Sequence, residues 1–176
     1  MWKLSILLLA LACPAAASVG DRIARQASRL VGAGPLAIDH DDCSGFVELV
    51  YRRERVPLRG SAEELRRVAA SRHALRFRRM RPGDLVFFRN TTSRKGITHV
   101  GIVESVAPGG EATFVHRTKS GVVRSHLDLR RPDLERDLRG RVHNDVLRRA
   151  RRGARARLTG ELFAGFADAG RMAAGG

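Results

Sequence analysis

The chain has 176 residues, of which 43% are hydrophobic and 29% are charged. This composition excludes a disordered chain, which would lack the apolar residues for a core, and the length is typical of one domain. Lys and Arg number 33 against 18 Asp and Glu, so the formal net charge is +15. Such a charge attracts polyanions, whether nucleic acid, anionic lipid or an acidic cell wall.

The first segment has the layout of a secretory signal. Lys3 is followed by an apolar run over residues 4–12 and then by small residues, and this run is too short to span a bilayer. Two outcomes stay open: removal of a signal peptide spanning 1–17, or lipidation at Cys13 after a lipoprotein signal spanning 1–12. Both predict an exported protein of the periplasm or cell envelope, and only a lipid anchor at Cys13 would hold it to the membrane.

Three helices are expected after this segment. Apolar residues recur at helical spacing over residues 21–31, and again from residue 43 after a loop that contains Gly and Pro. Ser61 and Glu64 have the spacing of a capping box, so a third helix should begin there.

The pattern changes to short strands from residue 81 onward. The segments DLVFF, THVGIVESV, ATFVHR and GVVRSHL are rich in β-branched or aromatic residues and are separated by turn sequences, which predicts an antiparallel meander. Helices followed by strands indicate an α+β domain. We expect this domain to span residues 18–158, with an Arg-rich stretch at 131–158 that is helical in part. Residues 159–176 are expected to form a C-terminal extension with a frayed tail.

Cys43 is the only thiol that remains once Cys13 is removed or acylated. An unpaired thiol in an exported protein is a candidate reactive group. Asp42 fits the N-cap position, which places Cys43 at a helix start. There the pKa of a thiol is lowered, and backbone amides can stabilise an oxyanion. A buried small residue is the alternative interpretation of this cysteine.

Two of the six histidines, His99 and His116, lie on consecutive predicted strands. A histidine on a single strand is more often a structural residue. Together with the thiol, however, one imidazole can take the thiol proton while the other orients the first through its ring N–H. His73 and His143 lie outside these segments and are expected to be dispensable for activity.

Four segments in this order, DCSGFVELVY, RPGDLVFF, THVGIV and FVHRTKSGVV, resemble the signature blocks of NlpC-type cell-wall peptidases. These are papain-like cysteine enzymes that cut peptidoglycan stem peptides. The resemblance implies an NlpC-type α+β domain, in which a helix that begins at the cysteine packs on an antiparallel sheet that bears both histidines. It also implies Cys43 as nucleophile, His99 as general base and His116 as the residue that orients the base.

The resemblance further implies that Asp42 and Ser44 bind the free amine of a stem peptide. The loop before Cys43 departs from the family pattern. In the family a tyrosine that follows a proline in this loop lines the substrate site, whereas here Leu36 follows Pro35.

The expected function is therefore that of an exported D,L-endopeptidase. It would cut the γ-D-glutamyl-diamino acid bond of peptidoglycan stem peptides as a monomer, without a metal or cofactor. An amidase or acyltransferase stays open, because these enzymes also pass through an acyl-enzyme. A basic, non-catalytic wall-binding protein stays open as well.

Two other classes of function are disfavoured. Nucleic acid is not an expected partner, because aromatic residues make up only 5% of the chain and no base-stacking motif occurs. A metal hydrolase is disfavoured, because adjacent residues such as those at 40–43 rarely converge on one ion, and no H-x-x-x-H or C-x-x-C pair occurs.

Overall fold

The computed structural model describes residues 17–38 and 40–174. Cys13 and almost all of the expected signal segment lie outside these ranges. Among the described residues, no helix has the length and apolar character needed to cross a membrane.

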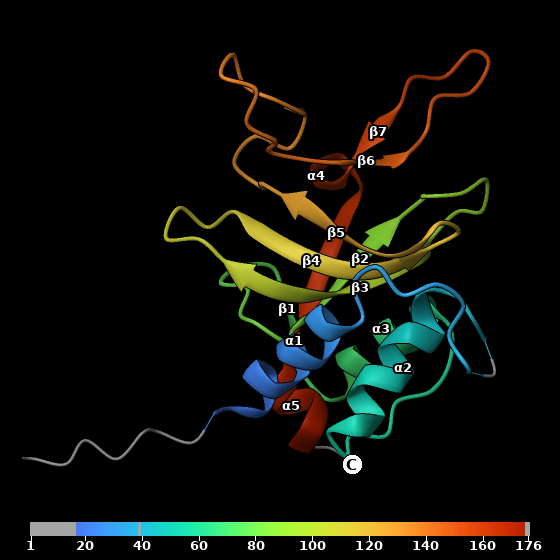
Figure 1. Ribbon diagram of the computed structural model, residues 1–176, viewed down its shortest axis with the longest axis vertical. Coiled ribbons are helices and arrows are strands. Elements are labelled where there is room, and N and C mark those ends of the chain that lie inside the picture. Colours follow the sequence, from blue (N-terminus) through green and yellow to red (C-terminus); the bar gives the residue numbers. More distant parts are fainter. Residues whose placement is uncertain (1–16, 39, 175–176) are drawn as a thin grey trace, which may run out of the picture.

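An antiparallel sheet forms the centre of the molecule, and helices cover one of its faces (Figure 1). The covering helices are α1 (Val19–Arg29), α2 (Cys43–Arg53), α3 (Ala62–Ser71) and α5 (Ala169–Ala174). Along the sheet, the order is β1 (Leu75–Arg76), β8 (Phe163–Ala167), β2 (Leu85–Arg89), β3 (Ile97–Val106), β4 (Ala112–Thr118) and β5 (Gly121–Leu127). The expected α+β fold is confirmed, with β2 to β5 forming the predicted meander.

Two of the helices begin at capping boxes, and the sequence predicts the one at α3. Ser18 and Asp21 form a capping box at α1, and Ser61 and Glu64 form one at α3. Each serine accepts a backbone N–H while the acidic side chain reaches back to the serine amide, so two otherwise unpaired donors are satisfied at each helix start.

Residues 85–88 of strand β2 are all apolar because both faces of the sheet are covered there. Leu85 and Phe87 pack into the core between the sheet and the helices. Val86 and Phe88 pack into a second core on the opposite face. All four side chains are fully buried, so β2 and its neighbour β3 form a rigid support for the residues that they carry.

Residues 159–174 belong to the domain and do not form an extension. Strand β8 lies inside the sheet, between β1 and β2, and Met172 of α5 is fully buried in the core beneath the helices. The expected boundary at residue 158 therefore needs correction. Strand β8 pairs with β2, which lies about 80 positions earlier in the chain. The local apolar pattern FAGFA does not reveal such a distant partner.

The Arg-rich segment 131–158, which the structure describes in full, contains no helix. It holds the small hairpin of β6 (Val146–Arg148) and β7 (Arg157–Leu158) and leads into the short helix α4 (Thr159–Leu162). Asn144 donates its amide to the carbonyl of Arg131 at 2.7 Å and to that of Leu134 at 3.0 Å. Because a buried side chain satisfies these carbonyls, the backbone has an alternative to helical hydrogen bonds.

Candidate active site

Helix α2 begins at Cys43, as the sequence predicts, and Asp42 caps it. The Asp42 carboxylate oxygen Oδ1 accepts the backbone N–H of Ser44 at 2.8 Å and that of Gly45 at 2.9 Å. A Cβ at Gly45 would lie 1.8 Å from the carbonyl oxygen of His40. Glycine therefore lets the preceding loop press against the first helical turn, which fixes the direction of the cysteine.

The loop that carries Asp42 is tied to strand β4 by an ion pair. Arg117 donates from Nε to Oδ1 of Asp41 at 2.7 Å and from its terminal nitrogen to Oδ2 at 2.6 Å. Arg117 directly follows His116 and its side chain is buried. This bidentate contact joins the cysteine loop to the strand that bears the second histidine, and the sequence analysis did not predict it.

His99 on β3 and His116 on β4 are hydrogen-bonded to each other. His99 Nε2 lies 2.7 Å from His116 Nδ1, and the two rings are almost perpendicular. His116 Nε2 in turn lies 3.0 Å from the hydroxyl oxygen of Ser125 on β5. At Gly101, a Cβ would lie 3.1 Å from the Cβ of His116, so this glycine allows the neighbouring strand to come close behind the ring.

One arrangement of protons makes His99 a base on its free nitrogen. If Nδ1 is to accept a proton, the ring proton must sit on Nε2, which then donates to His116 Nδ1. His116 must therefore carry its own proton on Nε2 and donate it to Ser125. The three side chains form a directional chain, and Ser125 is a member that sequence reasoning missed. Its only signal was a small polar residue at a position of β5 that alternates with the apolar residues Val123 and Leu127.

The proposed nucleophile and both histidines line one cavity of about 570 Å³. The other residues that line it are Asp41, Asp42, Thr91, Thr92, Thr98, Arg117, Thr118, Lys119 and Leu147. The tertiary structure thus brings together Cys43, His99 and His116 from three elements. Leu36, at the position of the family's tyrosine, packs against the core below and is not among the lining residues.

Burial dominates the electrostatics of the cavity. It raises the pKa of Cys43 to about 11, although hydrogen bonding from the Val100 amide acts in the opposite direction. Burial lowers the pKa of His99 to about 4, with the Asp42 charge opposing the shift, and burial together with His99 lowers that of His116 further below its usual value. Near pH 7 the thiol and both imidazoles are neutral, because the protein interior disfavours each charged form. The helix start alone predicts a lowered pKa for the Cys43 thiol, but burial, which the sequence does not reveal, raises it.

Asp42 and Ser44 lie beside Cys43, but much of their bonding capacity is used within the helix start. Ser44 is buried, and its hydroxyl donates to Oδ1 of Asp42 at 2.7 Å. With the two backbone amides, Oδ1 accepts three hydrogen bonds, so Oδ2 is the oxygen left for a ligand. Both residues line a cavity of about 180 Å³ that also contains Cys43 and adjoins the main one.

A group of metal-type ligands lies elsewhere in the described part of the chain. Atoms of Glu111, Asp128 and His143 come within 4.8 Å of one another. They are already engaged by protein groups: His143 Nδ1 is hydrogen-bonded to Asp128 at 3.0 Å, and Glu111 forms an ion pair with Arg141. These contacts explain why the three side chains lie together: they bind one another and neighbouring residues, and so stabilise the loop after β5.

Comparison with known proteins identifies related sequences. Residues 30–152 match the sequence model of the NlpC/P60 family. A solved structure of NlpC1 from Trichomonas vaginalis is 21% identical, with a TM-score of 0.45, and the match covers 60% of this chain and 38% of that one. A structure of an NlpC/P60 family protein from Bacillus cereus is 17% identical, with a TM-score of 0.48, and the match covers 85% of this chain and 39% of that one. The chain thus spans about two fifths of the length of these two proteins. No curated protein matches it significantly.

Proposed function

Because the chain belongs to the NlpC/P60 family, we propose that it is an exported cysteine peptidase that hydrolyses peptidoglycan stem peptides. The family consists typically of cysteine peptidases that act on the cell wall. The observation that supports this activity most strongly is the cavity that Cys43 and His99 both line, with His99 Nε2 hydrogen-bonded to His116 Nδ1. A cysteine that served only for packing would need no such chain of imidazoles.

In the proposed reaction, His99 Nδ1 removes the thiol proton as the sulfur of Cys43 attacks the carbonyl carbon of the scissile amide. The electron pair of the carbonyl moves to its oxygen. The Cys43 amide, which the Asp42 cap does not use, is positioned at the helix start to stabilise this oxyanion. The protonated His99 then donates its proton to the leaving amine, and the acyl-enzyme forms.

Water completes the turnover. His99 takes a proton from water as its oxygen attacks the thioester, and the proton returns to the sulfur when the carboxylic acid product leaves. His116 keeps the imidazole of His99 in the required orientation and tautomer throughout, because its Nδ1 accepts a hydrogen bond from the Nε2–H of that ring.

For the scissile bond, we propose the γ-D-glutamyl-diamino acid bond of the stem peptide. The support is the position of Asp42, which lines the cavity and whose second carboxylate oxygen is not used by the helix cap. This oxygen can bind the free amine at the end of the stem peptide. An amidase or acyltransferase would use the same thiol, and mass spectrometry of digested muropeptides distinguishes them by the bond cut and the acceptor used.

The test of the nucleophile and base uses hydrolysis of a soluble stem-peptide fragment. Cys43→Ala should abolish turnover, and His99→Ala should lower kcat by about 10²–10⁴-fold because the general base is lost. His116→Ala should cost less than His99→Ala, because water can partly replace an orienting residue. His73→Ala is the control, since this exposed histidine lies outside the cavity. Full activity of Cys43→Ala would refute the thiol mechanism.

Export is part of the proposal and has its own test. Fractionation of cells that express the full chain should place it in the periplasm or envelope. Comparison of the wild type with Cys13→Ala tells apart the two processing outcomes, because only a lipidated protein loses membrane association with this change. Retention of the wild type in the cytoplasm would contradict export.

A further inference from the structure

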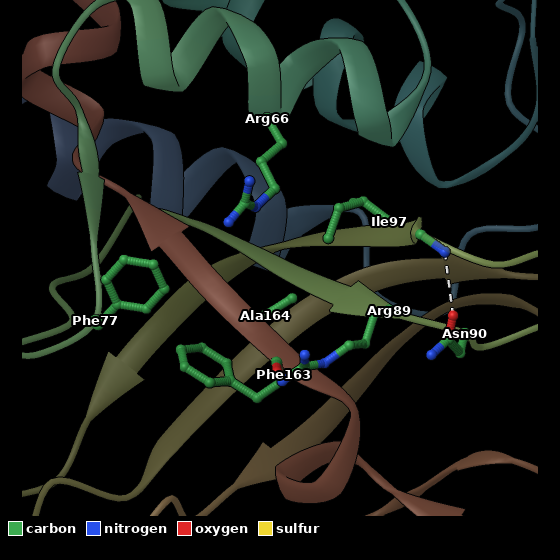
Figure 2. A pocket seen from close by; sticks show the side chains of 8 residues that line it. Arg66, Phe77, Arg89, Asn90, Ile97, Phe163 and Ala164 are labelled. Carbon is green, nitrogen blue, oxygen red and sulfur yellow. Dashed lines mark hydrogen bonds between the residues drawn. The ribbon is translucent and has the colours of Figure 1, made fainter.

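A separate cavity of about 410 Å³ lies between α3 and the sheet. We call it the Arg66–Arg89 pocket. Figure 2 shows Arg66 reaching down from α3, Arg89 extending from β2, and the rings of Phe77 and Phe163 beside β8. The lining residues are Arg66, Phe77, Arg89, Asn90, Gly96, Ile97, Phe163 and Ala164.

The pocket contains two positive charges and no acidic residue among those that line it. Neither Arg66 nor Arg89 forms an ion pair within the described part of the chain. The Nε of Arg66 is buried, and the described residues offer it no hydrogen-bond partner. A buried donor without an acceptor is costly, so Arg66 has hydrogen-bonding capacity that the described residues leave unused.

The second guanidinium is held in place by the backbone. Arg89 donates to the carbonyl oxygen of Phe163 at 3.3 Å, which keeps its charge on the floor of the pocket. Two planar guanidinium groups match an anion that has at least two acceptor oxygens, such as a carboxylate or a phosphate.

Part of the pocket lining is apolar. Phe77 is 61% exposed, and its ring lies on the side of Phe163 and Ala164 (Figure 2). Such a lining suits an anion attached to an aliphatic chain, as in a peptide, better than a phosphate attached to a hydroxylated polymer.

The pocket adjoins the candidate active site. Ile97 lines the Arg66–Arg89 pocket and also the small cavity that contains Cys43 and Ser44. The two spaces thus share a lining residue at the start of β3, and a peptide bound at Cys43 would reach the arginines by extending past Ile97.

We propose that the Arg66–Arg89 pocket binds a carboxylate of the peptide whose scissile bond lies at Cys43. The identity of this ligand rests on the proposed function, since peptidoglycan stem peptides carry free carboxylates. The existence of an anion site rests only on the pocket itself. The first experiment therefore measures binding alone.

The binding experiment uses full-length Cys43→Ala protein and follows the arginine Nε–H signals by NMR. N-acetyl-D-glutamate and inorganic phosphate serve as the two probes. The Arg66 signal should shift saturably with the carboxylate, and Arg89→Gln should weaken this binding. Arg67 is the matched internal control, because it is exposed on the same helix and lies outside the pocket. An Arg66 signal that moves no more than that of Arg67 overturns the site, and a response to phosphate alone overturns the carboxylate assignment.

The kinetic experiment compares stem-peptide fragments with free and with amidated carboxylates. The double variant Arg66→Gln/Arg89→Gln should lower kcat/KM for the free acid by about 10- to 100-fold, as expected for lost hydrogen bonds to charged groups. The amidated fragment and the Arg67→Gln variant should be unaffected. An equal loss on both fragments would mean that the arginines support the fold only, and would overturn the proposal. If the wild type cuts neither fragment, the proposed function fails, and the NMR result still decides the anion site.

Discussion

Cys43 and His99 are both neutral near pH 7, because burial raises the pKa of the first to about 11 and lowers that of the second to about 4. In this state His99 acts as a base during the attack, and we expect no thiolate–imidazolium pair beforehand. His99 must lose its proton to act, so kcat/KM should stay constant down to about pH 5 and fall as the pH passes the pKa near 4.

Alkylation by iodoacetamide provides a direct test of this neutral pair. The thiolate is the reactive form, so the rate at Cys43 should rise about tenfold per pH unit and level off only near pH 11. The measurement is the loss of free thiol at each pH. A rate that is already constant between about pH 5 and 8 would instead show a preformed ion pair.

In the arrangement of protons that makes His99 a base, Ser125 accepts the last hydrogen bond of the His99–His116 chain. Ser125→Ala should leave the buried N–H of His116 without its acceptor and free this ring to adopt the other tautomer. We expect kcat to fall by about tenfold, as for loss of one net hydrogen bond, with KM unchanged, and Ser125→Thr should restore it. Ser120→Ala, in the turn before β5, is the control. If Ser125→Ala lowers the melting temperature as well as kcat, and Ser125→Thr restores neither, then Ser125 serves packing alone.

At the level of elements, the loop between β5 and β6 depends on a buried histidine. The sequence analysis expected His143 to be dispensable for activity, but the structure shows it 3% exposed and hydrogen-bonded to Asp128 at 3.0 Å and to Asp137 at 3.3 Å. His143→Ala should therefore lower the free energy of unfolding by about 1–3 kcal/mol, since buried partners lose their hydrogen bonds.

Chemical denaturation measures this loss. His126→Ala is the control, because His126 is exposed while bonded to Asp145, and it should cost much less. If His143→Ala unfolds at the same denaturant concentration as the wild type, the polar cluster does not stabilise the loop. The lesson for function is that a histidine outside the catalytic segments still matters through the fold.

For the whole molecule, the net charge of +15 predicts that salt weakens binding to an acidic wall. Surface charges are screened over about 8 Å at physiological ionic strength and over about 3 Å at 1 M salt. Hydrolysis of intact sacculi should fall steeply with added salt. Hydrolysis of a small soluble muropeptide should fall much less, because it needs only the local site. Parallel curves for the two substrates would show that the basic surface plays no part in recruitment.

The parts of the fold that depend on neighbours in the chain could be predicted from local pattern. The capping box at α3 and the helix that begins at Cys43 depend on residues within a few positions of one another, and the meander from β2 to β5 pairs strands that follow one another directly in the chain. Cys43, His99 and His116 could be singled out by residue type and by their order in the matching segments. Strand β8 could not, because its place between β1 and β2 is decided by pairing with residues about 80 positions away.

Only the tertiary structure decided the chemistry around those residues. Whether a thiol at a helix start is acidic depends on how much water reaches it, and here burial outweighs the helix start and raises its pKa. Three features each join separate elements: the contact of Arg117 with Asp41, the hydrogen bond between His116 and Ser125, and the presence of Arg66 and Arg89 in one pocket. Local pattern specifies which face of an element is buried, whereas charge, proton position and cavity shape depend on what packs against that face.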